Sequence, residues 1–363
     1  MSSDHVQMNA TGVENIADWD GPLLMSGSYN ANSLIHMYGE HFEAFGHKVF
    51  RHYGAFEAGV TGVKLLDRVL LRASPGIVFS HASSQLEHLA STQKPAVILI
   101  FKGMDIKPDA LRRLKDRGFK LVCYNADHPY DFALRGTGNQ NVSASVSIYD
   151  LYVTYSRKIQ EEILERDPDT RTAIVPFGHS VSDDDVREIE DVIEIERICF
   201  AGTADAMRAK SIQCLAEAGL PVDVYGPGWK NFCGRTKNVR VMGAVYGKEL
   251  YRVLRAYKVQ LNLFRPHNEG AHNMRSFEIP ACGGVMLAPY STDHASQFVR
   301  DEEAFYYSDR RSMIDMAHHV LNLDPQKISK VRIRARTRCV ESGYSYAARS
   351  RSLAMLIADV AAS

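Results

Sequence analysis

Residues 264–284 hold the densest group of side chains that could do chemistry. The stretch reads FRPHNEGAHNMRSFEIPACGG: a polar loop, then the start of a helix, then a Gly pair. Glu278 lies among apolar neighbours, which predicts burial, and a buried carboxylate needs hydrogen-bond donors. Ribose hydroxyls would serve, and so would the guanidinium of Arg275 three residues earlier. We expect this segment to bind a ligand, with a structural ion pair as the alternative.

Two further segments have the composition of phosphate-binding or nucleotide-binding turns. Residues 199–210, CFAGTADAMRAK, run from an apolar strand into Gly202 and then a helix, while residues 224–229, VYGPGW, end a strand with two Gly around a Pro. A Gly at such a turn lets an anionic ligand approach the backbone, and a helix N-terminus favours phosphate. Ordinary turns are the structural alternative in both places.

Composition limits what these residues can belong to. The chain has 363 residues, 45% of them hydrophobic, with 43 basic and 43 acidic side chains. These values are typical of a soluble two-domain protein, and the zero net charge gives no overall attraction to nucleic acid. Six Cys without CxxC pairs indicate reduced thiols, and no signal peptide or ~20-residue apolar run appears, so we expect a cytoplasmic protein. The basic run at 327–338 is expected to be a solvated helix face, although peripheral membrane contact through it stays open.

Short apolar runs alternate with amphipathic segments from residue 21 onward, which predicts parallel strands joined by helices. Around residues 172–191 this alternation gives way to Pro, Gly and a dense acidic stretch, as in a linker. Ligands of such sheets bind at the carboxyl ends of strands, so the chemistry should lie in a cleft between the halves. The expected division is a tail at 1–20, a first domain at 21–178, a linker at 179–195, a second domain at 196–343 and a final helix at 344–363.

The helix after the polar loop resembles a family signature. Residues 196–350 are similar to the C-terminal domain of GT-B glycosyltransferases, in particular the spore maturation protein B-type group. The signature of that group is close to N-x-R-x-F-E-x-x-A-C-G, matched here by Asn273, Arg275, Phe277, Glu278, Ala281, Cys282 and Gly283. The resemblance implies an α/β GT-B fold, with two Rossmann-like domains facing each other across a cleft and the C-terminal helix returning to the first domain.

The resemblance also implies a nucleotide-sugar donor bound mainly by the second domain. Glu278 would hold the ribose, while the helix start and the Gly202 turn would receive the diphosphate. The expected donor-site residues are Gly202, Thr203, Tyr225, Gly226, Arg265, His272, Asn273, Arg275, Ser276 and Glu278. Many retaining members of the wider fold have two Glu separated by seven residues. Here eight residues lie between Glu269 and Glu278, so Glu269 stays a candidate near the donor sugar and the stereochemical outcome stays open.

In the first half, residues 124–132, YNADHPYDF, place Asp127 and His128 at the end of an expected strand. An inverting transferase needs a general base for the acceptor hydroxyl, and either side chain would serve. An Asx-type turn before the following proline is the alternative. Two more loops, SGSYNANS at 26–33 and FKGMD at 101–105, are expected to face the same cleft and to contact an acceptor.

No metal ion is expected in this site. The chain has no Asp-x-Asp in a suitable loop, and the acidic run at 183–185 lies in the expected linker. The leaving diphosphate would then be stabilised by helix dipoles, backbone N–H groups and bases such as Arg275 or Arg265. No cofactor is expected beyond the donor substrate itself.

The expected function is transfer of a sugar from a nucleotide-sugar to a hydroxyl of a glycan or glycoconjugate acceptor. Two alternatives stay open. One is a nucleotide-sugar epimerase of the same fold, and the other is a non-catalytic module that binds a nucleotide or a sugar. The nucleotide, the sugar, the acceptor and the oligomeric state are not fixed by these patterns.

Overall fold

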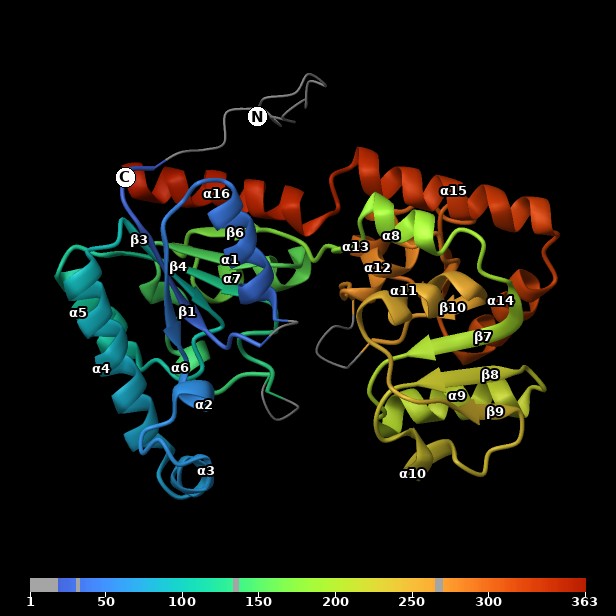
Figure 1. The fold of residues 1–363 in the computed structure, drawn as a ribbon, viewed down its shortest axis with the longest axis horizontal. Helices are drawn as coiled ribbons and strands as arrows, with labels where there is room; N and C mark the ends of the chain where they lie inside the picture. Colours follow the sequence, from blue (N-terminus) through green and yellow to red (C-terminus); the bar gives the residue numbers. More distant parts are fainter. Residues whose placement is uncertain (1–18, 31–32, 133–136, 265–269) are drawn as a thin grey trace.

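The chain folds into two α/β domains that lie side by side (Figure 1). The computed structural model describes residues 19–30, 33–132, 137–264 and 270–363. Each domain is built on a six-stranded sheet whose neighbouring strands run parallel. The α/β architecture in two domains, predicted from the alternation of apolar runs and amphipathic segments, is confirmed, and so are the two Rossmann-like domains that the resemblance implies.

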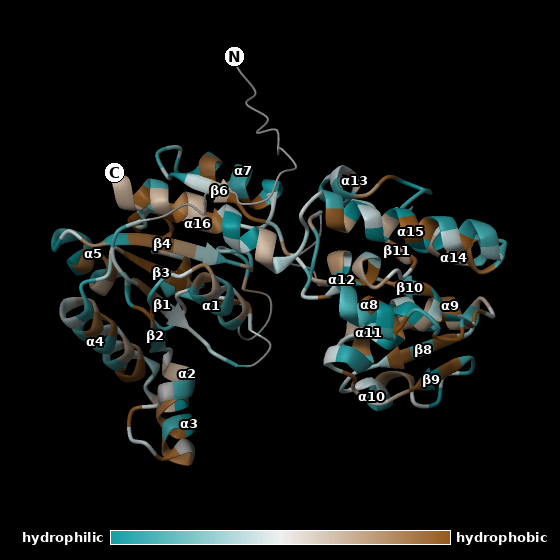
Figure 2. Cartoon of the chain, turned by 45° about the horizontal axis from the view of Figure 1, so that its top comes forward, coloured by the Kyte–Doolittle hydropathy of each residue, from teal (hydrophilic) through white to brown (hydrophobic). Residues whose placement is uncertain are grey.

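The first sheet has the strand order β2-β1-β3-β4-β5-β6. Its central strands are near-continuous apolar runs, as expected for parallel strands covered on both faces, and β3 and β4 are brown in Figure 2. In β3 the first four residues of VILIF are buried. The strands are β1 (Leu23–Gly27), β2 (Val49–Tyr53), β3 (Val97–Phe101), β4 (Lys120–Asn125), β5 (Leu151–Thr154) and β6 (Thr172–Ile174).

Helices cover both faces of the first sheet. One face packs against α1 and the C-terminal helix α16 in a shared apolar cluster, and the other packs against α4, α5 and α7. The helices of this domain are α1 (Leu34–Ala44), α2 (Ala55–Ala58), α3 (Lys64–Ala73), α4 (Pro75–Gln93), α5 (Pro108–Asp116), α6 (Gln140–Ser143), the 3-10 helix η1 (Val146–Ile148), α7 (Arg157–Arg166) and α16 (Tyr346–Ala362).

The second sheet has the order β12-β11-β10-β7-β8-β9. Helices α9 and α14 pack on one face, and α11 and α12 pack on the other. The strands are β7 (Ile195–Ala201), β8 (Val222–Tyr225), β9 (Val239–Val241), β10 (Tyr257–Leu261), β11 (Met286–Pro289) and β12 (Phe305–Tyr307). The helices are α8 (Asp183–Glu188), α9 (Ala206–Glu217), α10 (Trp229–Cys233), α11 (Gly247–Ala256), α12 (Arg275–Ala281), α13 (Thr292–Gln297), α14 (Arg310–Leu321) and α15 (Pro325–Glu341).

The strand orders fix where ligands would bind. In the first sheet, β1 has β2 on one side and β3 on the other, so the chain reverses direction across the sheet between β1 and β3. In the second sheet the same reversal occurs between β7 and β10. Crevices open at such points, outside the carboxyl ends of the strands, because the two following helices go to opposite faces.

Two chain segments connect the domains, and they touch where they cross. The outgoing segment follows β6, and the returning segment leads into α16 (Figure 1). The His179 N–H donates to the Tyr344 carbonyl at 3.1 Å, and the Tyr346 N–H donates to the His179 carbonyl at 2.9 Å. A side chain at Gly178 would come within 2.7 Å of the Tyr344 carbonyl oxygen, so the close crossing requires Gly at this position.

Candidate functional site

The second domain has a cavity of about 520 Å³ at the reversal point of its sheet. It lies beyond the carboxyl ends of β7 and β8 and is closed from one side by α12. Residues of α11, of α1 in the first domain and of the outgoing connection complete its walls. Six residues predicted for the donor site line it: Gly202, Thr203, Tyr225, Gly226, Arg275 and Glu278.

The floor of this cavity is made by two Gly turns that pack against each other. The Gly202 N–H donates to the Tyr225 carbonyl at 2.9 Å, joining the end of β7 to the end of β8. Gly226 has a φ of 127°, and a Cβ there would lie 2.3 Å from the Gly202 carbonyl oxygen. Only residues without side chains allow this approach, so the cavity presents backbone rather than side chains along this edge.

Glu278 and Arg275 form the charged part of the cavity wall. They are ion-paired one helical turn apart on α12, and the Arg275 Nε–H also donates to the Ala201 carbonyl at 3.2 Å. The Glu278 side chain is only 12% exposed and the Arg275 side chain 26%. The ion pair that the sequence offered as an alternative is therefore present, and it lies in the cavity wall. A carboxylate held this way can accept from ribose hydroxyls, and the guanidinium can donate to phosphate oxygens.

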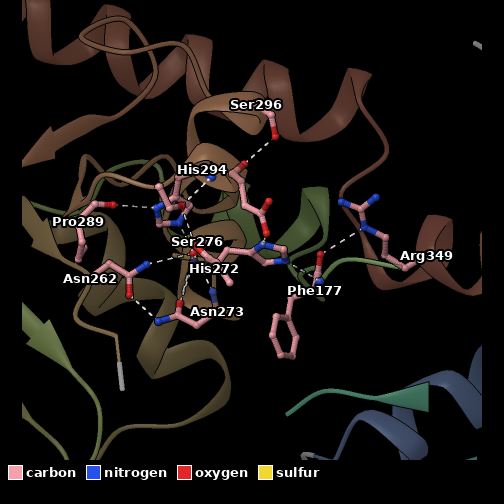
Figure 3. Close-up of polar contacts among 12 residues, drawn as sticks. Phe177, Asn262, His272, Asn273, Ser276, Pro289, His294, Ser296 and Arg349 are labelled. Atoms are coloured by element: carbon pink, nitrogen blue, oxygen red, sulfur yellow. Dashed lines mark hydrogen bonds and ion pairs between the residues drawn. The ribbon is translucent and has the colours of Figure 1, made fainter. Parts of the chain in front are cut away.

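Asn273 and Ser276 are used differently, in a buried polar network behind the cavity (Figure 3). The Asn273 side-chain oxygen accepts from the Ser276 N–H at 3.1 Å, and the Ser276 hydroxyl oxygen accepts from the Asn273 N–H at the same distance. Asn262 and His294 complete the network, at 2.8 Å from Asn273 and 2.5 Å from Ser276. Burial lowers the pKa of His294 to about 3, so its ring is neutral. The network holds the first turn of α12 against the end of β10. Asn273 and Ser276 thereby position Arg275 and Glu278.

His272 lies at the junction of the domains and is not part of the lining of the donor cavity described above. Its ring is buried between the edges of Tyr155, Phe177 and Phe277. Its Nε2 accepts from the Phe177 N–H at 3.4 Å (Figure 3), and burial lowers its pKa despite the carboxylate of Asp293 nearby. The position gives His272 a packing role between the domains. Two other predicted residues, Arg265 and Glu269, lie outside the described residues.

The first domain has its own cavity of about 390 Å³ at the reversal point of its sheet. It lies beyond the carboxyl ends of β1, β3 and β4, and its lining includes residues 27, 28 and 33–35 as well as residues 101, 102, 104 and 105. Both loops were expected to face the cleft. Asp127 lines the cavity and is ion-paired with Lys102 across it. A carboxylate in this place can accept a proton from a hydroxyl bound in the cavity.

His128 has a different environment from its neighbour Asp127. Its Nδ1 accepts from the N–H groups of Tyr130 and Asp131 at 3.2 and 3.0 Å, and its Nε2 lies 2.8 Å from a carboxylate oxygen of Glu162. Both ring nitrogens are therefore engaged in closing the turn. His128 is not part of the cavity lining, whereas Asp127 is.

Two acids of the first cavity were not singled out in the sequence. Glu57 accepts from the Ser28 hydroxyl and from the Tyr29 N–H, each at 2.7 Å. Asp105 is buried, accepts from the Ala55 N–H at 2.5 Å, and has its pKa raised by that burial. Asp105 is the last residue of the segment FKGMD. The sequence offered one signal that it lines the cavity, which is its place as an acid shortly after a buried strand. The signal for Glu57 depends on topology, because only the pairing of β1 with β2 brings it to Ser28.

Helix α1 connects the two cavities. Its N-terminal residues, 33–35, line the first cavity, and Met37 and Glu40 line the second. Since an α-helix rises 1.5 Å per residue, the two linings follow each other within about two turns. The two cavities therefore open on either side of one helix, in the region between the domains.

The basic run at 327–338 belongs to α15, and its arginines are paired within the chain. Each of four arginines contacts an acidic residue elsewhere in the fold: Arg332 with Glu194, Arg334 with Glu302, Arg336 with Asp183 and Arg338 with Glu303. Arg332 is moreover buried. The run is therefore largely neutralised by local pairs rather than presented as a positive surface. None of the helices in the described residues combines the length and the apolar character needed to cross a membrane.

The acidic run at 183–185 starts a short helix instead of an irregular linker. Ser182 caps α8, because its side chain accepts from the Asp185 N–H while the Asp185 carboxylate accepts from the Ser182 N–H. The side chains of Asp183 and Asp184 are 79% and 78% exposed, as expected for solvated charges. Within the described part of the chain, no group of three His, Cys, Asp or Glu side chains lies close enough to hold a metal ion.

Comparison with known proteins agrees with this geometry. Residues 208–355 match the family model described as glycosyl transferase-like. No protein of curated function matches the chain by sequence. Among solved structures, sucrose-phosphate synthase from Thermosynechococcus elongatus is similar with a TM-score of 0.69 at 13% identity, over 93% of this chain and 98% of that one.

Two more solved structures are similar over most of this chain. Anabaena HepE in complex with UDP-glucose has a TM-score of 0.66 at 11% identity, over 93% of this chain and 100% of that one. A candidate UDP-N-acetylglucosamine 2-epimerase from Listeria monocytogenes has a TM-score of 0.56 at 10% identity, over 92% of this chain and 94% of that one. At these identities the likeness shows the fold alone, which is the GT-B arrangement of two facing Rossmann-like domains.

Proposed function

We propose a reaction for this chain from the premise that its two domains form the GT-B fold and that its second domain is glycosyl transferase-like. The reaction is transfer of a sugar from a nucleotide-sugar donor to a hydroxyl of a glycan or glycoconjugate acceptor. The observation that carries it is the pair of cavities on either side of α1, one lined by Arg275 and Glu278 and the other by Asp127.

The donor is proposed to bind in the second-domain cavity. The Glu278 carboxylate would accept hydrogen bonds from the ribose, and the Gly202 and Gly226 turns would leave room for the ligand to approach the backbone. The bound complex of Anabaena HepE, which shares this fold, contains UDP-glucose. That complex supports a nucleotide-sugar as the class of donor, while the base and the sugar are left to experiment.

The acceptor is proposed to bind in the first-domain cavity, with Asp127 as the general base. The carboxylate would take the proton of the attacking hydroxyl as the new bond to the sugar forms. The bond between the sugar and the diphosphate breaks, and the negative charge that develops on the diphosphate would be stabilised by Arg275 and by backbone N–H groups. We propose that no metal ion takes part. Closure of the domains around both substrates would exclude water and so limit donor hydrolysis.

A nucleotide-sugar epimerase is the second candidate, favoured by the structural likeness to the Listeria protein. An epimerase needs a donor but no acceptor. Incubation with nucleotide-sugars alone separates the two reactions, because only an epimerase would return a stereoisomer of the sugar. Persistent donor binding without any turnover over a broad acceptor panel would instead indicate a binding module.

The central assignment is tested by calorimetric titration of nucleoside diphosphates and nucleotide-sugars into the wild-type protein and into Glu278→Ala, in the presence of a chelator. Because a hydrogen bond to a charged group contributes about 1.5–3 kcal/mol, the substitution should weaken nucleotide binding roughly 10- to 100-fold. Glu249→Ala is the matched control, since Glu249 also pairs with an arginine three residues away but is 71% exposed on α11.

The same titration has two outcomes that contradict the proposal. If Glu278→Ala keeps its fold and binds nucleotides as tightly as the wild type, the donor is not held at α12. If nucleotide binding or sugar transfer is lost in the chelator and restored by Mg²⁺, the reaction depends on a metal ion.

A further inference from the structure

The described lining of the first-domain cavity has a net negative charge, whereas a phosphorylated acceptor would need positively charged side chains. Three carboxylates line it, those of Glu57, Asp105 and Asp127, against a single described cation, Lys102. We propose that the acceptor is a neutral or amine-bearing sugar and that this cavity discriminates against phosphorylated ones. This inference rests on the proposed function, because it names the class of acceptor for the same site.

Each acidic group is held in place by the fold. Glu57 is fixed by the Ser28 hydroxyl and the Tyr29 N–H, both 2.7 Å away, and Asp105 by the Ala55 N–H. Gly54 leaves room for the Asp105 side chain, since a Cβ added at residue 54 would lie 2.4 Å from an Asp105 carboxylate oxygen. These hydrogen bonds hold the carboxylates of Glu57, which is exposed, and Asp105, which is buried, in the wall of the cavity.

The balance of charge stays negative when the other contributions are included. The described lining residues carry a formal charge of −2. The N-terminus of α1 points its first turn at the cavity through residues 33–35, and a helix N-terminus is equivalent to roughly half a positive charge. Burial raises the pKa of Asp105, which makes this carboxylate easier to protonate than an exposed aspartate. Even with Asp105 neutral, the lining side chains keep a charge of −1, which the helix N-terminus reduces to roughly −0.5.

The rest of the lining suits the apolar face of a sugar ring. Leu34, Ile35, Phe101, Met104 and Tyr124 form the other walls. A sugar placed against such a surface keeps its hydroxyls or an amine toward the carboxylates, which accept from O–H and N–H groups. A phosphate in the same place would meet like charge in a partly desolvated cavity, which opposes binding.

The experiment measures binding of matched monosaccharides by saturation-transfer NMR and calorimetry. The probes are the amine-bearing, neutral and 6-phosphorylated forms of glucose, galactose and mannose. In at least one ring series we expect the amine-bearing or neutral form to bind about tenfold more tightly than the phosphorylated form. The difference should shrink at high salt, because screening weakens interactions between charges near solvent.

Two variants connect the preference to the named acids. Glu57→Gln removes the charge of an exposed side chain, so the fold should survive, and Asp105→Asn removes the buried one. Either change should reduce the preference against the phosphorylated sugar severalfold, and Glu87→Gln, which alters an acid paired with Arg113 outside the cavity, should leave it unchanged.

The outcomes separate this inference from the function on which it rests. Equal or tighter binding of the phosphorylated forms, absence of binding in all three ring series, or a preference unchanged in both variants would overturn the acceptor class. Failure of the proposed function would appear elsewhere, as absence of nucleotide binding in the second cavity. A protein that binds nucleotides normally but prefers sugar phosphates refutes only the inference.

Discussion

The two cavities are built from different parts of the chain, although both lie at the reversal point of a parallel sheet. The first is lined by charged side chains from three elements or loops, including Glu57, Lys102 and Asp127. The second presents backbone at Gly202 and Gly226, and its charged side chains are concentrated on α12 and α1. The same fold principle has thus produced one cavity that offers a ligand mainly side chains and one that offers it largely backbone groups.

This difference matches two tasks. A nucleoside diphosphate presents the same groups whichever sugar it carries, so a backbone turn and one ion pair can recognise it. An acceptor is recognised by the placement of its hydroxyls and charges, which only side chains can match in detail. We therefore expect substitutions in the first cavity to change the reaction and its acceptor, and substitutions in the second to change donor affinity and local stability.

The largest effect is expected from Asp127→Asn in the first cavity. The amide cannot take a proton from the acceptor, and loss of a general base lowers turnover by roughly 10²- to 10⁴-fold. Nucleotide affinity should stay unchanged, because Asp127 lies in the other cavity. Steady-state transfer rates with a donor found by the nucleotide screen measure the first quantity, and calorimetry measures the second.

Asp150→Asn is the matched control for Asp127→Asn, since Asp150 is also paired with a lysine, Lys115 at 3.1 Å, but lies outside both cavities. Turnover within a factor of about three of wild type is expected for the control. Full activity of Asp127→Asn would contradict the proposed catalytic role of the first cavity. It would also contradict the proposed division of tasks between the two cavities.

A smaller effect is expected from Gly226→Ala in the second cavity. Its φ of 127° is strained for any other residue, and the new Cβ would meet the Gly202 carbonyl. Together the backbone strain and the overlap should cost about 3 kcal/mol in the free energy of unfolding and weaken donor binding.

Gly219→Ala provides the comparison for Gly226→Ala. Gly219 has a φ of 85° and open space around its Cβ position, so only the strain of about 1 kcal/mol should remain. Chemical denaturation of both variants gives the difference directly. If the two Gly are equally tolerant of Ala, the turns at β7 and β8 do not pack as closely as described.

The smallest of the three effects concerns acid. Burial lowers the pKa of His52 in the first domain to about 4, below the ordinary value of 6.5. The unfolded chain therefore binds a proton at this residue before the folded chain does, and stability falls as the pH decreases from about 6.5 toward 4. By pH 5 this one group should lower the free energy of unfolding by about 2 kcal/mol.

His52→Gln tests the acid effect, because glutamine has no charge to gain in this range. Urea denaturation at pH 7.5 and pH 5 should show a smaller loss of stability for the variant than for the wild type. An equal loss in both proteins would assign the acid sensitivity to other groups, such as His294 in the second domain, whose pKa burial also lowers.

Much of the fold could be predicted because its signals are local. The runs VILIF and KLVCYN are too apolar and too short to be anything but buried strands, and they became β3 and β4. The helix that carries Arg275 and Glu278 was predicted, and both side chains line the second-domain cavity. Helix α13 was missed, because its six residues, TDHASQ, have little apolar periodicity and depend on the cap that Ser291 provides.

The site was less accessible to sequence reasoning, and the residues show why. From the sequence, the neighbours Asp127 and His128 are equally suitable as a general base. In the structure, the ring nitrogens of His128 are engaged by backbone N–H groups and by Glu162. Asn273 belongs to the family signature and Ser276 lies within it at an unspecified position, and yet both lie behind the cavity, where they position other side chains. Such distinctions depend on which way each side chain turns, and composition and spacing do not contain that information.

The double crossing of the chain between the domains has a mechanical consequence. With a single connection, two domains can swing and twist about several directions. Here the segment that follows β6 and the segment that leads into α16 are hydrogen-bonded side by side at His179, so the two connections form one line of contact, beside the packing around His272. Motion about that line opens or closes the space between the cavities, whereas twisting would break these bonds. We therefore expect the two domains to move as a hinge about His179, with α1 of the first domain close to that hinge.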